Sequence, residues 1–130
     1  MRFMMIVKAN KDYEAGKPPS PALMTEVARH SQEQMKKGTL LMSGGLFPSS
    51  EGARIYLSGG ELTVKDGPFS ETKELVGGFA ICQASSKEEA IEQGKAFMRL
   101  HAKTLGPSYE GQLEIRQLAG PDDPCFGEQG

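Results

Sequence analysis

The chain has 130 residues, the size of one domain, and 38% of them are hydrophobic. Its 16 glycines and 8 prolines are too few for a low-complexity chain, which excludes a largely disordered protein. The net charge is −2, and no basic block exceeds Lys36-Lys37, so we expect no direct nucleic-acid binding. The longest apolar run, 3–7, is too short for a membrane span or a signal peptide, which predicts a cytoplasmic protein that does not engage membranes.

The sequence carries none of the common cofactor or metal motifs. Cys82 and Cys125 lie far apart and lack metal-ligand spacing, so reduced thiols with a structural role are expected. There is no glycine-rich phosphate loop and no nucleophile elbow. We therefore expect no metal and no cofactor.

A first strand is predicted over residues 2–8, where the apolar residues are continuous rather than alternating. Such a run indicates a strand that is covered on both faces. In so small a domain, helices can cover one face, and a second subunit is the simplest cover for the other. This pattern is the first indication of a homodimer.

A helix is predicted over 21–37, after a polar loop at 9–20. Ser20 and Pro21 form a typical helix start, and Gly38 a typical stop. One helical stripe recurs through it, made of Met24, Val27, Ala28, Ser31 and Met35.

Short strands follow. A strand is expected at 40–43, and runs at 54–57 and 61–65 flank Gly59-Gly60 as a hairpin. A loop at 66–75 then leads into a strand at 76–84.

A second helix begins after Ser85 or Ser86, each of which has a glutamate three residues on, and ends at Gly106-Pro107. Its predicted inner stripe consists of Ala90, Ile91, Gly94, Phe97, Met98 and His101. Residues 113–118 form the last strand.

This order of elements predicts an α+β fold: the ferredoxin-like split βαβ plan with an added β-hairpin. The domain would cover residues 1–119 and be followed by a tail, 120–130. With helices on one sheet face only, two sheets would pack face to face across the dimer.

Residues 64–79, VKDGPFSETKELVGGF, resemble the signature of the DGPF group of YCII-related proteins. The likeness extends over roughly residues 1–118 and includes MRFMMIVKA, GTLLMSGGLFPSS, SSKEEAIEQGKAFMRLH and EGQLEIRQL. The resemblance implies a ferredoxin-like fold that dimerises into an α+β barrel.

The same resemblance implies two kinds of function. Some YCII-related branches place a His and an Asp together in a cleft, which implies an enzyme. Many DGPF proteins are encoded beside extracytoplasmic-function sigma factors, which implies a regulatory role. His30 aligns with a position where DGPF proteins often carry an aromatic residue, so the resemblance assigns no catalytic histidine to the first helix.

Asp66, in Asp-Gly-Pro, is the strongest single candidate for a functional residue. Its carboxylate would act as a general base, or else accept backbone N–H bonds and hold the turn. His101 continues an apolar helical stripe and is either a half-buried structural residue or a general base tuned by a nearby carboxylate.

A polar loop follows that turn. Phe69 would anchor it, Thr72 and Lys73 would contact an anionic group, and Glu71 would act as acid or base; the alternative is a solvated loop. Arg116, in the last strand, is either an anion clamp or a partner of Glu114, Glu71 or a subunit edge.

Two hypotheses result. In the first, the protein binds a small anionic or polar molecule. If it is catalytic, it is a cofactor-independent lyase or isomerase, with Asp66 or His101 taking a proton while Arg116 or Lys73 holds the developing anion. In the second, it is a non-catalytic regulatory or interaction module associated with a sigma factor. The second predicts an exposed apolar patch near the tail and Phe126.

Overall fold

The computed structural model describes residues 1–121 and 123. The helices and strands in chain order are β1 (Arg2–Lys8), α1 (Lys11–Glu14), α2 (Pro21–Lys36), β2 (Leu40–Gly45), β3 (Ala53–Ser58), β4 (Glu61–Asp66), β5 (Val76–Gln83), α3 (Lys87–Leu105) and β6 (Leu113–Gln117). Short 3₁₀ turns at Ser49–Glu51 and Thr72–Glu74 precede β3 and β5.

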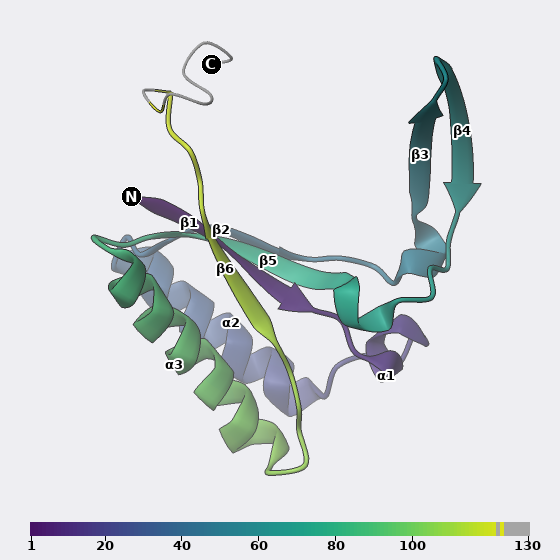
Figure 1. Cartoon of the computed structure of the whole chain (residues 1–130). Coiled ribbons are helices and arrows are strands. Elements are labelled where there is room, and N and C mark those ends of the chain that lie inside the picture. The colour runs from purple at the N-terminus through teal and green to yellow at the C-terminus, as the bar shows by residue number, and fades with distance from the viewer. Residues whose placement is uncertain (122, 124–130) are drawn as a thin grey trace.

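Four strands form one antiparallel sheet in the order β2-β5-β1-β6. Helices α2 and α3 lie side by side on one face of this sheet, as Figure 1 shows. The arrangement is the split βαβ, ferredoxin-like fold with an inserted hairpin, as the sequence predicts. Within the described residues, no helix is long and apolar enough to cross a membrane.

The core lies between this sheet and α3. Its buried side chains are those of Phe3, Met5, Leu40, Cys82, Ala84 and Ala90. Gly94 lets α3 approach β6 closely, because a Cβ at this position would lie 3.1 Å from Cδ1 of Ile115 and 3.2 Å from Cδ2 of Leu113. The predicted inner stripe of α3 is confirmed, and it buries Ala90, Gly94 and His101.

The inner face of α2 differs from the predicted stripe. Met24 and Met35 are more than half exposed, and Ala28 is exposed too. The half-buried positions are Leu23, Glu26, Val27, His30, Ser31 and Gln34. The helix is therefore rotated by about one residue, because its contact surface is α3 and a polar face packs there alongside Leu23 and Val27.

A short helix, α1, lies within the segment predicted as a loop. The side chain of Asn10 accepts a hydrogen bond from the N–H of Tyr13 (2.8 Å) and caps it. The hydroxyl of Tyr13 donates to the carbonyl of Leu46, which ties α1 to the chain after β2. A single turn held by such contacts leaves little periodicity in the sequence.

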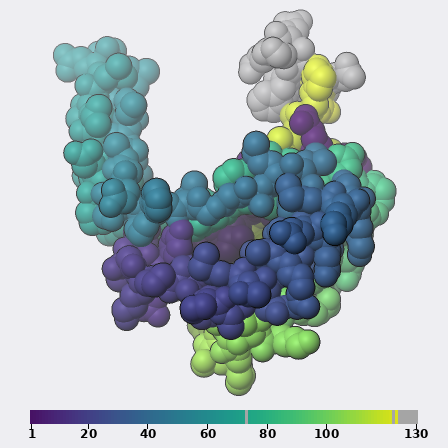
Figure 2. All heavy atoms as spheres, turned by 180° about the vertical axis from the view of Figure 1, so that it is seen from behind, coloured from purple at the N-terminus to yellow at the C-terminus, as the bar shows by residue number. Residues whose placement is uncertain are grey.

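Strands β3 and β4 form a separate two-stranded sheet that we call the arm (residues 53–66). Figure 1 shows the arm rising from the end of the sheet where β1 finishes, on the side away from the helices. In Figure 2 it stands clear of the rest of the molecule, in teal. Every residue of both strands is exposed.

We call the sheet face that lies away from the helices the open face. Register and alternation place Met4, Ile6, Phe79 and Ile81 on it, opposite the buried Phe3 and Met5. Met42 pairs with Ile81 and extends the same surface. Among the described residues, Figure 1 shows no helix or strand covering this face, and the arm projects on the same side.

The predicted tail falls mostly on residues that the structure does not describe. Cys125 and Phe126 are among them, so the expectations for both lie outside the described residues.

Candidate functional site

The structure places Asp66 and His101 in different parts of the chain. Asp66 is exposed at the base of the arm, where it pairs with Ala53. His101 is 7% exposed and lies on α3, on the helix side of the sheet. Within one chain the two side chains therefore do not form the acid–base pair that the sequence hypothesis requires.

His101 belongs to an aromatic cluster. Its ring packs edge-on to Phe97 (4.6 Å between centroids) and stacks on Tyr109 (5.6 Å). Its Nδ1 lies 2.9 Å from the carbonyl oxygen of Phe97, one helical turn back. Because a carbonyl oxygen can only accept, Nδ1 is the donor in this contact.

The second histidine lies at the edge of the same cluster. His30 of α2 is 6.0 Å from Phe97 between ring centroids. Burial lowers the pKa of His30; the charge of Glu33 opposes that shift, and the charge of Lys37 adds to it. The cluster thus joins the two helices. Its rings pack against one another, as in a core rather than a cleft.

The Asp-Gly-Pro-Phe segment that follows β4 is tied to α1 through Ser49. The carboxylate of Glu14 accepts from the N–H of Ser49 (2.9 Å) and from its hydroxyl (2.5 Å). The Ser49 hydroxyl oxygen in turn accepts from the N–H of Phe69 (3.1 Å). This chain of bonds fixes the base of the arm against the body of the domain.

Gly67 shows how closely these segments approach. A Cβ at this position would overlap the backbone carbonyl oxygen of Ser49. The N–H of Gly67 also donates to the carbonyl of Gly52 (2.9 Å). The motif around Asp66 therefore builds the joint between the arm and the sheet, whatever chemistry its carboxylate has.

Phe69 contacts the arm itself. The guanidinium carbon of Arg54 lies 3.8 Å from the centre of the Phe69 ring, a cation–π contact at the arm's base. Phe69 thus anchors this loop, although its partner is a cation and not only an apolar pocket.

The polar residues after Phe69 form a backbone turn. Thr72 is half-buried, Glu71 is exposed, and the carbonyls of both accept hydrogen bonds from the N–H groups of Leu75 and Glu74. The side chain of Lys73 lies outside the described residues. Their roles as ligand-binding groups stay predictions.

A charged group lies on the open face, on β1 and the neighbouring edge strand β6. Nζ of Lys8 is 3.3 Å from one carboxylate oxygen of Glu114, and Nη1 of Arg116 is 3.3 Å from the other. Arg116 therefore has the Glu114 partner that the sequence allowed. The hydrogen bonds from Arg116 and then Lys8 lower the pKa of Glu114.

This charged group adjoins the apolar floor of the open face. Glu114 pairs with Ile6 and Arg116 with Met4, so the charges lie directly beside those two apolar side chains. Two cations share one carboxylate, which leaves an excess positive charge at this edge of an apolar surface. Such a surface suits a ligand with an anionic end and an apolar body.

Sequence reasoning did not single out Lys8, Glu14 or Ser49. Lys8 ends an otherwise apolar strand, and its side chain is only 12% exposed, which is unusual for lysine. A lysine directly after a buried strand was the one available signal. Glu14 and Ser49 are 35 residues apart and left none.

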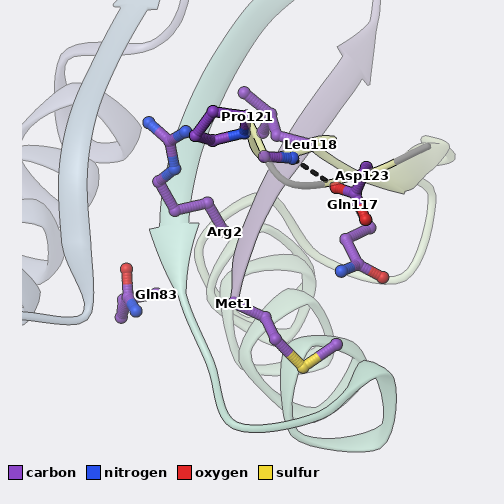
Figure 3. A pocket seen from close by; sticks show the side chains of 8 residues that line it. Met1, Arg2, Gln83, Gln117, Leu118, Pro121 and Asp123 are labelled. Atoms are coloured by element: carbon purple, nitrogen blue, oxygen red, sulfur yellow. Dashed lines mark hydrogen bonds between the residues drawn. The ribbon is translucent and has the colours of Figure 1, made fainter. Parts of the chain in front are cut away.

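A hollow of about 390 Å³ lies at the end of the sheet where β1 begins, as Figure 3 shows. It is lined by Met1, Arg2, Gln83, Gln117, Leu118, Gly120, Pro121 and Asp123. It contains none of the residues that the sequence points to, and the carboxylate of Asp123 already accepts from the N–H of Gly120.

Comparison with known proteins gives two matches. The sequence profile of the YCII-related domain matches residues 1–101. An uncharacterised protein of Rhizobium meliloti (strain 1021) is 30% identical over 97 residues, which cover 75% of this chain and 73% of that protein. Together with the ferredoxin-like sheet, these matches show that the chain belongs to the YCII-related family.

Proposed function

We propose that this protein is a homodimer that binds a small amphipathic anion on the open face of its sheet. One observation carries the proposal: the Lys8–Glu114–Arg116 group lies on the same face as the apolar side chains of Met4 and Ile6. Binding sites for small molecules are commonly apolar surfaces with a few convergent polar groups.

The ion pairs define the anion's position. Lys8 is nearly covered, whereas the Arg116 side chain is 72% exposed, so its guanidinium has donors free for a second carboxylate or a phosphate. The apolar part of the ligand would lie over Met4 and Phe79. In a face-to-face dimer, the partner's sheet would supply the other wall of the site.

Proton transfer between Asp66 and His101 is not part of this proposal. His101 is buried on α3, and that helix lies on the face of the sheet opposite to the open face. An association with a sigma factor stays a prediction; the patch near Phe126 on which it would depend lies outside the described residues.

The experiment uses the methionine methyl groups as reporters. Met4 and Met5 are neighbours on β1 but point to opposite faces of the sheet, so Met5 is an internal control for Met4. We expect hexanoate to shift the ε-methyl NMR signals of Met4 and Met42 at constant protein concentration, and to leave Met5 unchanged. Neutral 1-hexanol should shift them less.

A matched pair of variants tests the cation. Arg116→Gln should weaken hexanoate binding about tenfold, as expected for a lost charge-assisted hydrogen bond. Arg99→Gln, an exposed change on α3, should have no effect. The proposal is wrong if Met4 does not respond, or if both variants bind hexanoate equally well.

A further inference from the structure

The arm has one apolar face and one polar face. Its register pairs Ile55 with Val64 and Leu57 with Leu62, and alternation places these four side chains on one side. Their exposed fractions are 70%, 64%, 72% and 71%. The opposite side carries Arg54, Tyr56, Thr63 and Lys65.

An isolated two-stranded hairpin is marginal in water, and this one leaves most of its apolar face exposed. Each of its four aliphatic side chains carries on the order of 100 Å² of apolar surface, so one arm presents roughly 300 Å². Contiguous apolar patches of this size mark interaction surfaces. The arm therefore requires a cover that residues 1–121 and 123, the described part of the chain, do not supply.

The position of the arm identifies that cover. It projects from the same side of the molecule as the open face, and Figure 2 shows it standing beside the body with free space between. Leu46 and Phe47, the latter 84% exposed, lie in the segment between the open face and the arm. The arm and the open face thus border the same side of the molecule.

The area of these surfaces suits a second copy of this chain. A standard dimer buries about 800 Å² on each partner, more than one arm can provide alone. In a face-to-face dimer the open face, which carries Met4, Ile6, Phe79 and Ile81, would add its area to that of the arm. In a two-fold dimer the same patch serves both partners, so each arm covers its partner while the two open faces meet.

We propose that the arm is a clasp, which packs Ile55, Leu57, Leu62 and Val64 against a second copy of this chain. This inference rests on the homodimer of the proposed function. It adds that the hairpin supplies a large part of the dimer's binding energy.

Two neighbouring pairs in the arm make a matched test. Leu57→Asp/Leu62→Asp places two charges on the apolar face, and Tyr56→Asp/Thr63→Asp places the same charges on the polar face. By sedimentation equilibrium, the first double variant should raise the dimer dissociation constant at least about 100-fold, because it would bury two carboxylates without partners. The second should change it less than about threefold. Equal effects would overturn the proposal.

Amide hydrogen exchange on the unmodified protein keeps the test valid if the first variant misfolds. The amides of 53–66 should gain protection as the protein concentration rises through the dimer dissociation constant. Rapid exchange of the arm in a fully formed dimer would overturn the clasp while leaving the homodimer intact. A chain that stays monomeric would overturn both, and an arm that is then protected only by another protein would identify a different partner.

The two proposals fail in different ways. If the arm is not a clasp, hexanoate still shifts Met4 in the unmodified protein. If the open face binds no anion, the Leu57/Leu62 variant still dissociates the dimer.

Discussion

Glu14 accepts two hydrogen bonds from Ser49, one from the backbone N–H at 2.9 Å and one from the hydroxyl at 2.5 Å. This pair connects α1 with the base of the arm, across 35 residues of sequence. Loss of the carboxylate would leave a half-buried N–H without its acceptor, at a cost of about 1–3 kcal/mol.

Glu14→Ala should therefore lower the free energy of unfolding by about 1–3 kcal/mol in urea titrations. Asp12→Ala, which removes an exposed carboxylate from the same helical turn, should cost less than about 1 kcal/mol. Similar losses in the two variants would show that the Glu14–Ser49 contact is not a structural joint.

Gly67→Ala should destabilise the protein by more than about 1 kcal/mol, because the new methyl group overlaps the Ser49 carbonyl and backbone must move. Gly52→Ala is the control in the same joint. A Cβ there would lie 3.5 Å from the same oxygen, an ordinary contact at φ −109°, so this change should be neutral or stabilising by up to about 1 kcal/mol. A melting temperature of Gly67→Ala equal to or above that of Gly52→Ala would contradict the prediction.

The stability of the helical layer should depend on pH through His30. Burial lowers the pKa of His30 in the folded state, so folding favours the neutral ring. The resulting stability is complete above the unfolded value of about 6.5 and declines as the pH falls through and below it. His30→Gln should therefore lose less stability than the unmodified protein between pH 7.5 and 5.5. Equal losses in urea titrations would contradict this, and His101, present in both proteins, cancels from the comparison.

Glu114 should make a separate contribution at lower pH. The bonds from Arg116 and Lys8 lower the pKa of Glu114, so its contribution is present above the unfolded value of about 4.3 and is lost as the pH falls further. Melting temperatures between pH 6 and pH 3 should fall more steeply for the unmodified protein than for Glu114→Gln. Glu110→Gln, at an exposed carboxylate before β6, should follow the unmodified protein.

Much of the fold follows from local signals in the sequence. Ser20 caps α2 as predicted, and of the two serines that could begin α3 it is Ser86 whose side chain caps the helix. The apolar stripe of α3 correctly predicts which face of this helix is buried, since the helix packs on an apolar sheet. The stripe of α2 did not, because its main neighbour is another helix, against which half-buried polar side chains are tolerated.

The candidate site was harder to predict because it depends on contacts between distant segments. Asp66 is conspicuous in the sequence, yet the structure uses its neighbours Gly67 and Phe69 to join the arm to the domain. The open-face group needs the pairing of β1 with β6, which brings Lys8 beside Glu114. No periodicity within either strand encodes that pairing.

The alternation of side chains along the arm limits how this hairpin can change in length. Each residue added to both strands lengthens the arm by about 3.3 Å but turns every side chain beyond it to the opposite side. Only additions or deletions of two residues per strand keep Leu57 and Leu62 on the side of Ile55 and Val64. Related proteins with a functional arm should therefore differ in its reach by steps of about 6.6 Å, while the Gly59-Gly60 tip and the Ser49 joint stay the same.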